Sequence, residues 1–368
     1  MSGLETLQNK PPDSDEIEVS LFGPGFGESM VVHTGSNQWI TVDSCQDLGT
    51  DGDNAALSYL EKISVDPATA VKLVVITHWH DDHIGGVSEI LDSCPDAKFA
   101  ITAALEKSEF LSAIAPWIAD PNAESKGLNE IRRIGKRLKC LRPKLASGNT
   151  ILFERKSPFP CTIRALSPSD ASVLSCIARL EGLTNADWRG RLPSIEGNHC
   201  SVVLSLEIAD RLILLGADLE TRSSRDHGWL AAVDLHVESE RGKHSLFKIP
   251  HHGSPNGDHP EIWEKLVTDE AHLILAPFVN GSVMRPEHSD IKRILGRSQN
   301  AWITARPEGG KFRSFSRAVQ KQMNEKARRV VEIPRGYGHL RIRGKIGDDP
   351  RNWSVEKFGQ AVNLSAVL

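Results

Sequence analysis

Four side chains that bind metal ions well fall within six consecutive residues of this sequence. They belong to the segment Thr77-His78-Trp79-His80-Asp81-Asp82-His83, which follows an apolar, β-branched run. In an extended segment the side chains of His78 and His80 point to the same side, so that they can chelate one cation. Asp82 and His83 then turn toward a second cation. A packing role explains the motif poorly, because a buried carboxylate without a partner is costly. We therefore expect a metal site here.

Two later segments offer further ligands. Asp218 follows the apolar run Leu212–Leu215, and the adjacent His251 and His252 follow another short strand. A carboxylate can bridge two divalent ions about 3.5–4 Å apart, and such a pair of ions activates water near neutral pH. Taken alone, Asp218 is more typical of a turn. Together with the histidine motif it predicts a dinuclear centre.

The elements around these side chains predict the fold class. Val71–Ile76 is too apolar to face water, which indicates a buried central strand that ends at the histidine motif. Two sets of strands, each with its own helices, predict an α/β fold, a four-layer αβ/βα sandwich with polar loops gathered at one edge. Further strands are expected at Ile17–Phe22, Met30–His33, Trp39–Val42, Thr162–Leu166, Ser201–Ile208, Leu212–Leu215, Phe247–Pro250 and Leu273–Ala276, with helices that include Asn54–Ile63 and Ala171–Leu183.

Composition excludes several protein classes. The 368 residues are 39% hydrophobic and 25% charged, and no apolar run approaches the ~18 residues that cross a bilayer. Six cysteines without a C-x-x-C pair, and a polar N-terminus without an apolar signal core, predict a reduced, soluble, cytoplasmic protein. We divide the chain into a flexible tail (1–16), a hydrolase domain (17–305) and a small basic C-terminal extension (306–368). Within the extension we expect a helix at Lys311–Arg329 and strands at Val330–Ile333 and Leu340–Ile346.

Several motifs, in order and spacing, resemble the metallo-β-lactamase superfamily over roughly Ile17–Ala305. Within it, they look most like the soluble hydrolase domain of competence DNA-uptake channel proteins. The segments that carry the resemblance are Gly27-Glu28-Ser29, Val42-Asp43-Ser44, Thr77–Gly86, Asn198-His199-Cys200-Ser201, Gly216-Ala217-Asp218 and Pro250–Ser254. The resemblance implies the sandwich fold, two Zn²⁺ ions per chain and hydrolysis by metal-activated hydroxide. Mn²⁺ is the alternative metal, because oxygen ligands favour it.

The same resemblance implies roles for individual residues. Asp43 is the buried acid that orients the histidine loop, and Asp218 bridges the two metals. His78 and His80 hold one metal, while Asp82 and His83 hold the other and Asp82 also counts as catalytic.

Two positions stay open between neighbouring residues. His251 or His252 completes the second metal site. We prefer His251 as the ligand because it comes first after the strand, which leaves His252 as a catalytic residue that contacts substrate or acts as general acid. The third motif offers His199 or Asn198, and we prefer His199 as the ligand because zinc favours imidazole over a carboxamide. Asn198 then faces the substrate.

Charge suggests the substrate class. Arg285–Lys345 holds sixteen Lys and Arg residues against five acids, although the chain as a whole has a net charge of −4. Such a basic stretch suits a phosphate-containing partner, either a nucleotide or DNA or RNA, with no membrane contact. A carboxylic ester, lactone or amide hydrolase is the second reading, and a non-enzymatic partner module with structural metal is the third. A homo-oligomer or a protein partner also stays open. The substrate-binding residues that we expect are Asn198, His288, Arg306, Lys311 and Arg313.

Overall fold

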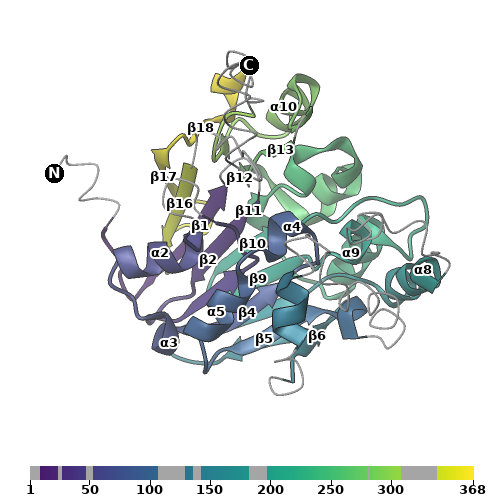
Figure 1. Cartoon of the computed structure of the whole chain (residues 1–368). Coiled ribbons are helices and arrows are strands. Elements are labelled where there is room, and N and C mark those ends of the chain that lie inside the picture. The colour runs from purple at the N-terminus through teal and green to yellow at the C-terminus, as the bar shows by residue number, and fades with distance from the viewer. Residues whose placement is uncertain are drawn as a thin grey trace, which may run out of the picture.

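The computed structural model is built around two large β-sheets (Figure 1). None of its described helices is long and apolar enough to span a bilayer. The structure describes residues 9–23, 27–46, 53–106, 129–135, 142–181, 197–280, 282–307 and 338–368.

The first sheet has eight strands and contains the central strand expected from the sequence. That strand, β4, is parallel to both of its neighbours, β3 and β5, so that the carboxyl ends of these three strands lie at one edge. β1 and β2 pair in antiparallel fashion. In spatial order the strands are β17 (Ser354–Gly359), β16 (Gly338–Lys345), β1 (Glu16–Gly23), β2 (Ser29–His33), β3 (Trp39–Val42), β4 (Val71–Ile76), β5 (Lys98–Thr102) and β6 (Lys144–Ala146).

The second sheet also has eight strands. The strands expected at Ser201–Ile208 and Leu212–Leu215 are present as the antiparallel pair β9 (Leu204–Ile208) and β10 (Arg211–Leu215). β10 is parallel to β11 (His244–Lys248). In spatial order the strands are β18 (Val362–Asn363), β15 (Ala301–Ile303), β12 (Val267–Leu275), β11 (His244–Lys248), β10 (Arg211–Leu215), β9 (Leu204–Ile208), β8 (Cys161–Ala165) and β7 (Ile151–Arg155), and a separate hairpin is formed by β13 (Phe278–Asn280) and β14 (Val283–Arg285).

Helices cover the outer faces of both sheets, and the alternation of side chains along the strands explains why. On β4, Leu73 and Val75 belong to the core cluster between the sheets, whereas Val74 and Ile76 pack under helices. Three apolar clusters therefore separate four layers, which confirms the predicted α/β sandwich. The described helices are α2 (Ala55–Lys62), α3 (Pro67–Ala70), α4 (Asp81–Ile84), α5 (Val87–Ser93), α8 (Asp170–Glu181), α9 (Gly228–Glu238) and α10 (His288–Leu295), with short turns η1 (Ala103–Glu106), η2 (Asn198–Cys200), η3 (His251–Gly253), η4 (Pro255–Gly257), η5 (Ile262–Leu266) and η6 (Leu364–Val367).

The described C-terminal residues lie within the sandwich. β16, expected from the sequence as a strand at Leu340–Ile346, pairs with β1 along its whole length, from Glu16 opposite Lys345 to Gly23 opposite Gly338. β17 continues the first sheet, and β18 forms the edge of the second. The helix expected at Lys311–Arg329 and the strand expected at Val330–Ile333 lie outside the described residues.

Candidate metal centre

The candidate ligands follow the carboxyl ends of strands from both sheets. In the first sheet, Asp43 follows β3 and the histidine motif follows β4, which are parallel neighbours. In the second sheet, Asp218 follows β10 and His252 follows β11, which are also parallel neighbours. Parallel strands expose their carboxyl ends at the same edge, so two parallel pairs packed face to face bring four loops together.

One group of four ligand atoms has the dimensions of a metal site. One ligand atom each from Asp82, His83, Asp218 and His252 lies within 4.8 Å of all the others, and all four residues are buried. His83 Nε2 lies 3.3 Å from Asp218 Oδ2 and 3.7 Å from Asp82 Oδ2. His252 Nε2 lies 3.3 Å from Asp82 Oδ2 and 3.5 Å from Asp218 Oδ2. Ligands about 2.1 Å from a tetrahedral zinc ion are about 3.4 Å apart, so this group fits such an ion.

The hydrogen bonds on the far side of each imidazole leave the ligand nitrogen as an acceptor. His83 Nδ1 lies 2.8 Å from Asp43 Oδ2, and His252 Nδ1 lies 3.1 Å from the carbonyl oxygen of Ala276. Both partners only accept, so each Nδ1 carries the proton. In the neutral form of each ring Nε2 presents a lone pair, and Nε2 makes no hydrogen bond although it is buried. Buried acceptors of this kind are explained by metal coordination.

The carboxylates of this group stabilise positive charge. Burial lowers the pKa of His83, but Asp218 and Asp82 outweigh burial and raise it well above its ordinary value. Burial also opposes a charge on His252, yet Asp218 helps to raise its pKa to about 10. Burial would raise the pKa of Asp82, whereas His83 and His252 lower it to about 2. A divalent cation supplies the positive charge that these carboxylates favour without placing a proton on the ligands.

Asp43 holds the histidine loop in place, as the resemblance implies. One carboxylate oxygen accepts the backbone N–H of Thr77 at 2.7 Å. The other accepts the Thr77 hydroxyl at 2.6 Å and His83 Nδ1 at 2.8 Å. Because the Thr77 hydroxyl donates to Asp43, its oxygen is left to accept from His78 Nδ1, 3.0 Å away. Asp43 therefore sets the orientation of two imidazole rings.

His78 and His80 lie beside the four-ligand group and offer a second cation position. The ring centroid of His78 is 4.6 Å from that of His80 and 4.2 Å from that of His83. Burial, with help from His83 and His80, lowers the pKa of His78, so its ring is neutral. His78 Nε2 and Asp218 Oδ1 are buried and make no hydrogen bond. With His80, these two atoms are the candidates for holding a second cation beside the four-ligand group.

We preferred His251 as the ligand, but the structure brings the other histidine of the pair to the candidate ligands. His252 belongs to the four-ligand group, whereas His251 Nδ1 lies 2.9 Å from Asn256 Oδ1 and His251 Nε2 lies 3.1 Å from Asn198 Nδ2. The expectation rested on an extended strand leading into the pair. Both histidines instead have left-handed backbones, with φ of 48° and 52°, so the chain turns there and directs the second imidazole inward.

The preference for His199 at the third motif was also not met. Arg222 Nε donates to His199 Nδ1 at 3.1 Å, and His199 Nε2 lies 3.5 Å from Glu220 Oε2. Asn198 Nδ2 contacts Glu220 Oε1 at 3.0 Å, next to His251. The tight turn η2 directs both side chains toward Glu220, and it is the backbone of Gly197 that lies against His80.

The other predicted substrate-binding residues are at the surface or outside the described part of the chain. His288 is exposed in the first turn of α10, and Arg306 is exposed shortly after β15. Asn198 is partly buried at the rim of the ligand loops. Lys311 and Arg313 lie outside the described residues.

The hairpin formed by β13 and β14 borders the metal centre. The Phe278 ring lies 5.3 Å from the His252 ring, centroid to centroid. Asn280 pairs with Val283 across the hairpin and is two residues from Phe278, so these side chains share one face. Met284 is opposite Val279 and lies on the other face. Val283 and Met284 are 52% and 39% exposed, which leaves an apolar tip beside the site. No sequence signal pointed to this hairpin.

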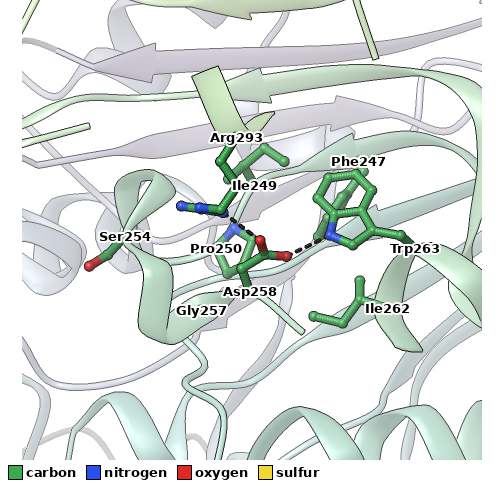
Figure 2. A pocket seen from close by; sticks show the side chains of 9 residues that line it. All are labelled: Phe247, Ile249, Pro250, Ser254, Gly257, Asp258, Ile262, Trp263 and Arg293. Atoms are coloured by element: carbon green, nitrogen blue, oxygen red, sulfur yellow. Dashed lines mark hydrogen bonds and ion pairs between the residues drawn. The ribbon is translucent and has the colours of Figure 1, made fainter. Parts of the chain in front are cut away.

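A pocket is lined by Pro250 and Ser254, which flank His251 and His252 in the sequence, and by residues that include Asp258 and Trp263 (Figure 2). In it, Asp258 accepts hydrogen bonds from Trp263 Nε1 at 2.5 Å and from the Arg293 guanidinium at 2.6 Å. The same guanidinium donates to the carbonyl oxygen of Gly253 at 2.6 Å. The pocket is lined by none of the candidate ligands, and these contacts brace the His252 loop.

Comparison with known proteins finds similarity to solved structures and to one family model. The metallo-beta-lactamase fold protein YhfI from Bacillus subtilis is 12% identical, with a TM-score of 0.41, and the match covers 80% of this chain and 98% of that one. A HARLDQ-motif mutant metallo-beta-lactamase from Cronobacter sakazakii is 14% identical, with a TM-score of 0.32, over 62% of this chain and 75% of that one. No curated protein matches the sequence.

Residues 23–120 match the family model described as the metallo-beta-lactamase superfamily. This region contains Asp43 and the whole histidine motif. The matched region is about a quarter of the chain, and the two-sheet sandwich is consistent with the metallo-β-lactamase fold. The Asp/His group is a candidate metal site.

Proposed function

We propose that this chain is a metal-dependent hydrolase that cleaves phosphodiester bonds. The observation that carries the proposal is the buried charge at the candidate centre. Four carboxylates, those of Glu28, Asp43, Asp82 and Asp218, are at most 7% exposed, and the ammonium group of Lys248 lies among them, also buried. With neutral histidines, four negative charges and one positive charge leave a net charge of −3.

Two divalent cations would change this net charge to +1. A phosphodiester is a monoanion at neutral pH and balances a single positive charge, whereas a neutral carboxylic ester does not. Uncompensated buried charge is costly, so before hydroxide binds, a site with this charge favours an anionic ligand. The basic composition of Arg285–Lys345 supports the same substrate class.

The residues at this centre have different roles. Divalent cations bound here supply Lewis-acid catalysis and an activated water. Asp43 keeps the ligand loop in place, and Asp218 would hold a cation together with Asp82, His83 and His252. His251 is partly exposed beside these ligands and is held by Asn198 and Asn256, so it is placed to contact the substrate.

Metal analysis combined with two classes of ester tests this proposal. We expect about two Zn²⁺ or Mn²⁺ ions per chain, with hydrolysis of bis-p-nitrophenyl phosphate and of single-stranded DNA in preference to p-nitrophenyl acetate. Asp82→Ala/His83→Ala should lose both the metal and the activity. Asp269→Asn, at an exposed carboxylate on β12, is the matched control and should retain both.

The outcomes separate the alternatives. Bound metal with turnover of only the neutral ester would replace our proposal with carboxylic ester, lactone or amide hydrolysis. Bound metal without turnover of either ester would favour a partner module with structural metal. A wild-type protein that binds no divalent metal would refute the hydrolase.

A further inference from the structure

A charge pair is buried between the two sheets beneath the candidate metal centre. Glu28 immediately precedes β2 in the first sheet, and Lys248 ends β11 in the second. Lys248 Nζ forms an ion pair with Glu28 Oε1, and neither side chain has any solvent exposure. The pair therefore links the two halves of the sandwich where the ligand loops meet.

Each member of the pair also contacts ligands of the centre. Lys248 Nζ donates to the carbonyl oxygen of Ala217 at 3.0 Å and lies 3.9 Å from Asp218 Oδ1. Glu28 Oε2 lies 3.7 Å from His252 Nδ1, and Glu28 Oε1 lies 3.9 Å from His83 Nδ1.

The backbone strengthens this link. The N–H of Glu28 donates to the carbonyl oxygen of Asp82 at 3.0 Å. Through its side chain and main chain, Glu28 thus reaches ligands from both sheets.

Stability alone explains such a pair poorly. Removing two full charges from water is expensive, and well-packed apolar residues of similar volume are often equally stabilising or more so. A role in setting ligand geometry explains why this desolvation cost is tolerated. The ligands from the two sheets must keep separations near 3.4 Å to share a cation.

We propose that Glu28 and Lys248 are positioning residues that set the separation of the ligands contributed by the two sheets. This inference rests on the proposed metal centre but not on the substrate. The pair acts through Asp218, His252 and His83.

The decisive variant is Glu28→Gln/Lys248→Met, which keeps the shape of both side chains and the net charge of the site. If the pair contributed only charge, the double variant would bind metal as the wild type does. Positioning instead predicts a loss of about 10–100-fold in Co²⁺ affinity, and a changed visible absorption spectrum of the Co²⁺ complex, which reports on ligand geometry.

The single variant Lys248→Met separates the two explanations further. It makes the site more negative, so a purely electrostatic role predicts tighter Co²⁺ binding, whereas positioning predicts weaker binding. Glu18→Gln/Arg343→Met is the matched control, because it removes another buried ion pair, at 2.8 Å, that contacts none of the candidate ligands. Urea unfolding of every variant establishes that it is folded.

A folded double variant with wild-type Co²⁺ affinity and an unchanged spectrum would overturn the positioning role. A different result would refute the proposed function alone: a wild type that binds Co²⁺ but hydrolyses no phosphodiester. A wild type without Co²⁺ binding would overturn both.

Discussion

Gly197→Ala is expected to damage the centre without damaging the fold. Gly197 has right-handed helical angles, φ −54° and ψ −48°, which alanine adopts readily. A Cβ atom there would lie 2.4 Å from His80 Nε2 and 2.8 Å from its Cδ2. Ordinary carbon contacts are about 3.5 Å or longer, so the ring must retreat by about 1 Å. Since the obstacle is the end of a side chain, the imidazole swings away and the backbone stays in place.

This displacement exceeds the tolerance of a metal bond, which is about 0.2 Å. We expect the cation content to fall from two to one and hydrolysis to slow by about 100-fold, equivalent to about 2.7 kcal/mol in the activation free energy. The free energy of unfolding should stay constant or rise by up to about 1 kcal/mol, because alanine restricts the unfolded chain.

Metal analysis, urea unfolding and phosphodiester kinetics on the same samples check these values. Gly296→Ala is the matched control, since Gly296 also has right-handed angles and its added Cβ meets only backbone oxygens of α10 at 3.3–3.4 Å. Two bound cations and full activity in Gly197→Ala would refute the placement of His80 in the centre.

Three further results are expected. Asp43→Asn should weaken Zn²⁺ binding by about 10–100-fold in a competition titration, because His83 and Thr77 lose their charged acceptor; unchanged affinity would contradict this role. Burial, with help from His236, lowers the pKa of His244 to about 3, so the unfolded chain binds an extra proton below pH 6.5. The free energy of unfolding should therefore fall as the pH drops from 6.5 toward 3, and His244→Gln should flatten this slope in urea titrations; an equal slope would exclude His244 as a source. Val283→Asp should raise KM for bis-p-nitrophenyl phosphate, whereas Met284→Asp, on the opposite face of the hairpin, should not; equal effects would mean that neither face contacts the substrate.

Local motifs account for the part of the site that could be read from the sequence. Four candidate ligands within six residues, at the end of an apolar strand, predicted a metal site, and the structure places Asp82 and His83 in the ligand group. Asp218 was identified in the same way, by its position after a strand. Ligands that follow strand ends are recognisable because both the strand and the ligand spacing are encoded within a few residues.

Neighbouring candidates could not be separated in this way. The choice between His251 and His252 depends on two consecutive left-handed residues, and neither histidine requires that conformation. The choice between Asn198 and His199 depends on Glu220 and Arg222, whose loop meets η2 only in the folded chain. Adjacent residues in such a turn direct their side chains differently. The sequence pattern therefore identifies the loop that carries a ligand, but it does not show which of two neighbouring residues is that ligand.

The apolar alternation and the strand endings of the sequence determined the α/β sandwich and most of its ligand motif. Only the tertiary structure decided how the two sheets meet. Lys248 looked like an ordinary strand residue, and its role depends on Glu28, 220 positions away in the chain. β16 was expected as a strand, but its pairing with β1 was not. Burial and pairing between distant segments are set by the packing of whole sheets, and no short stretch of residues encodes them.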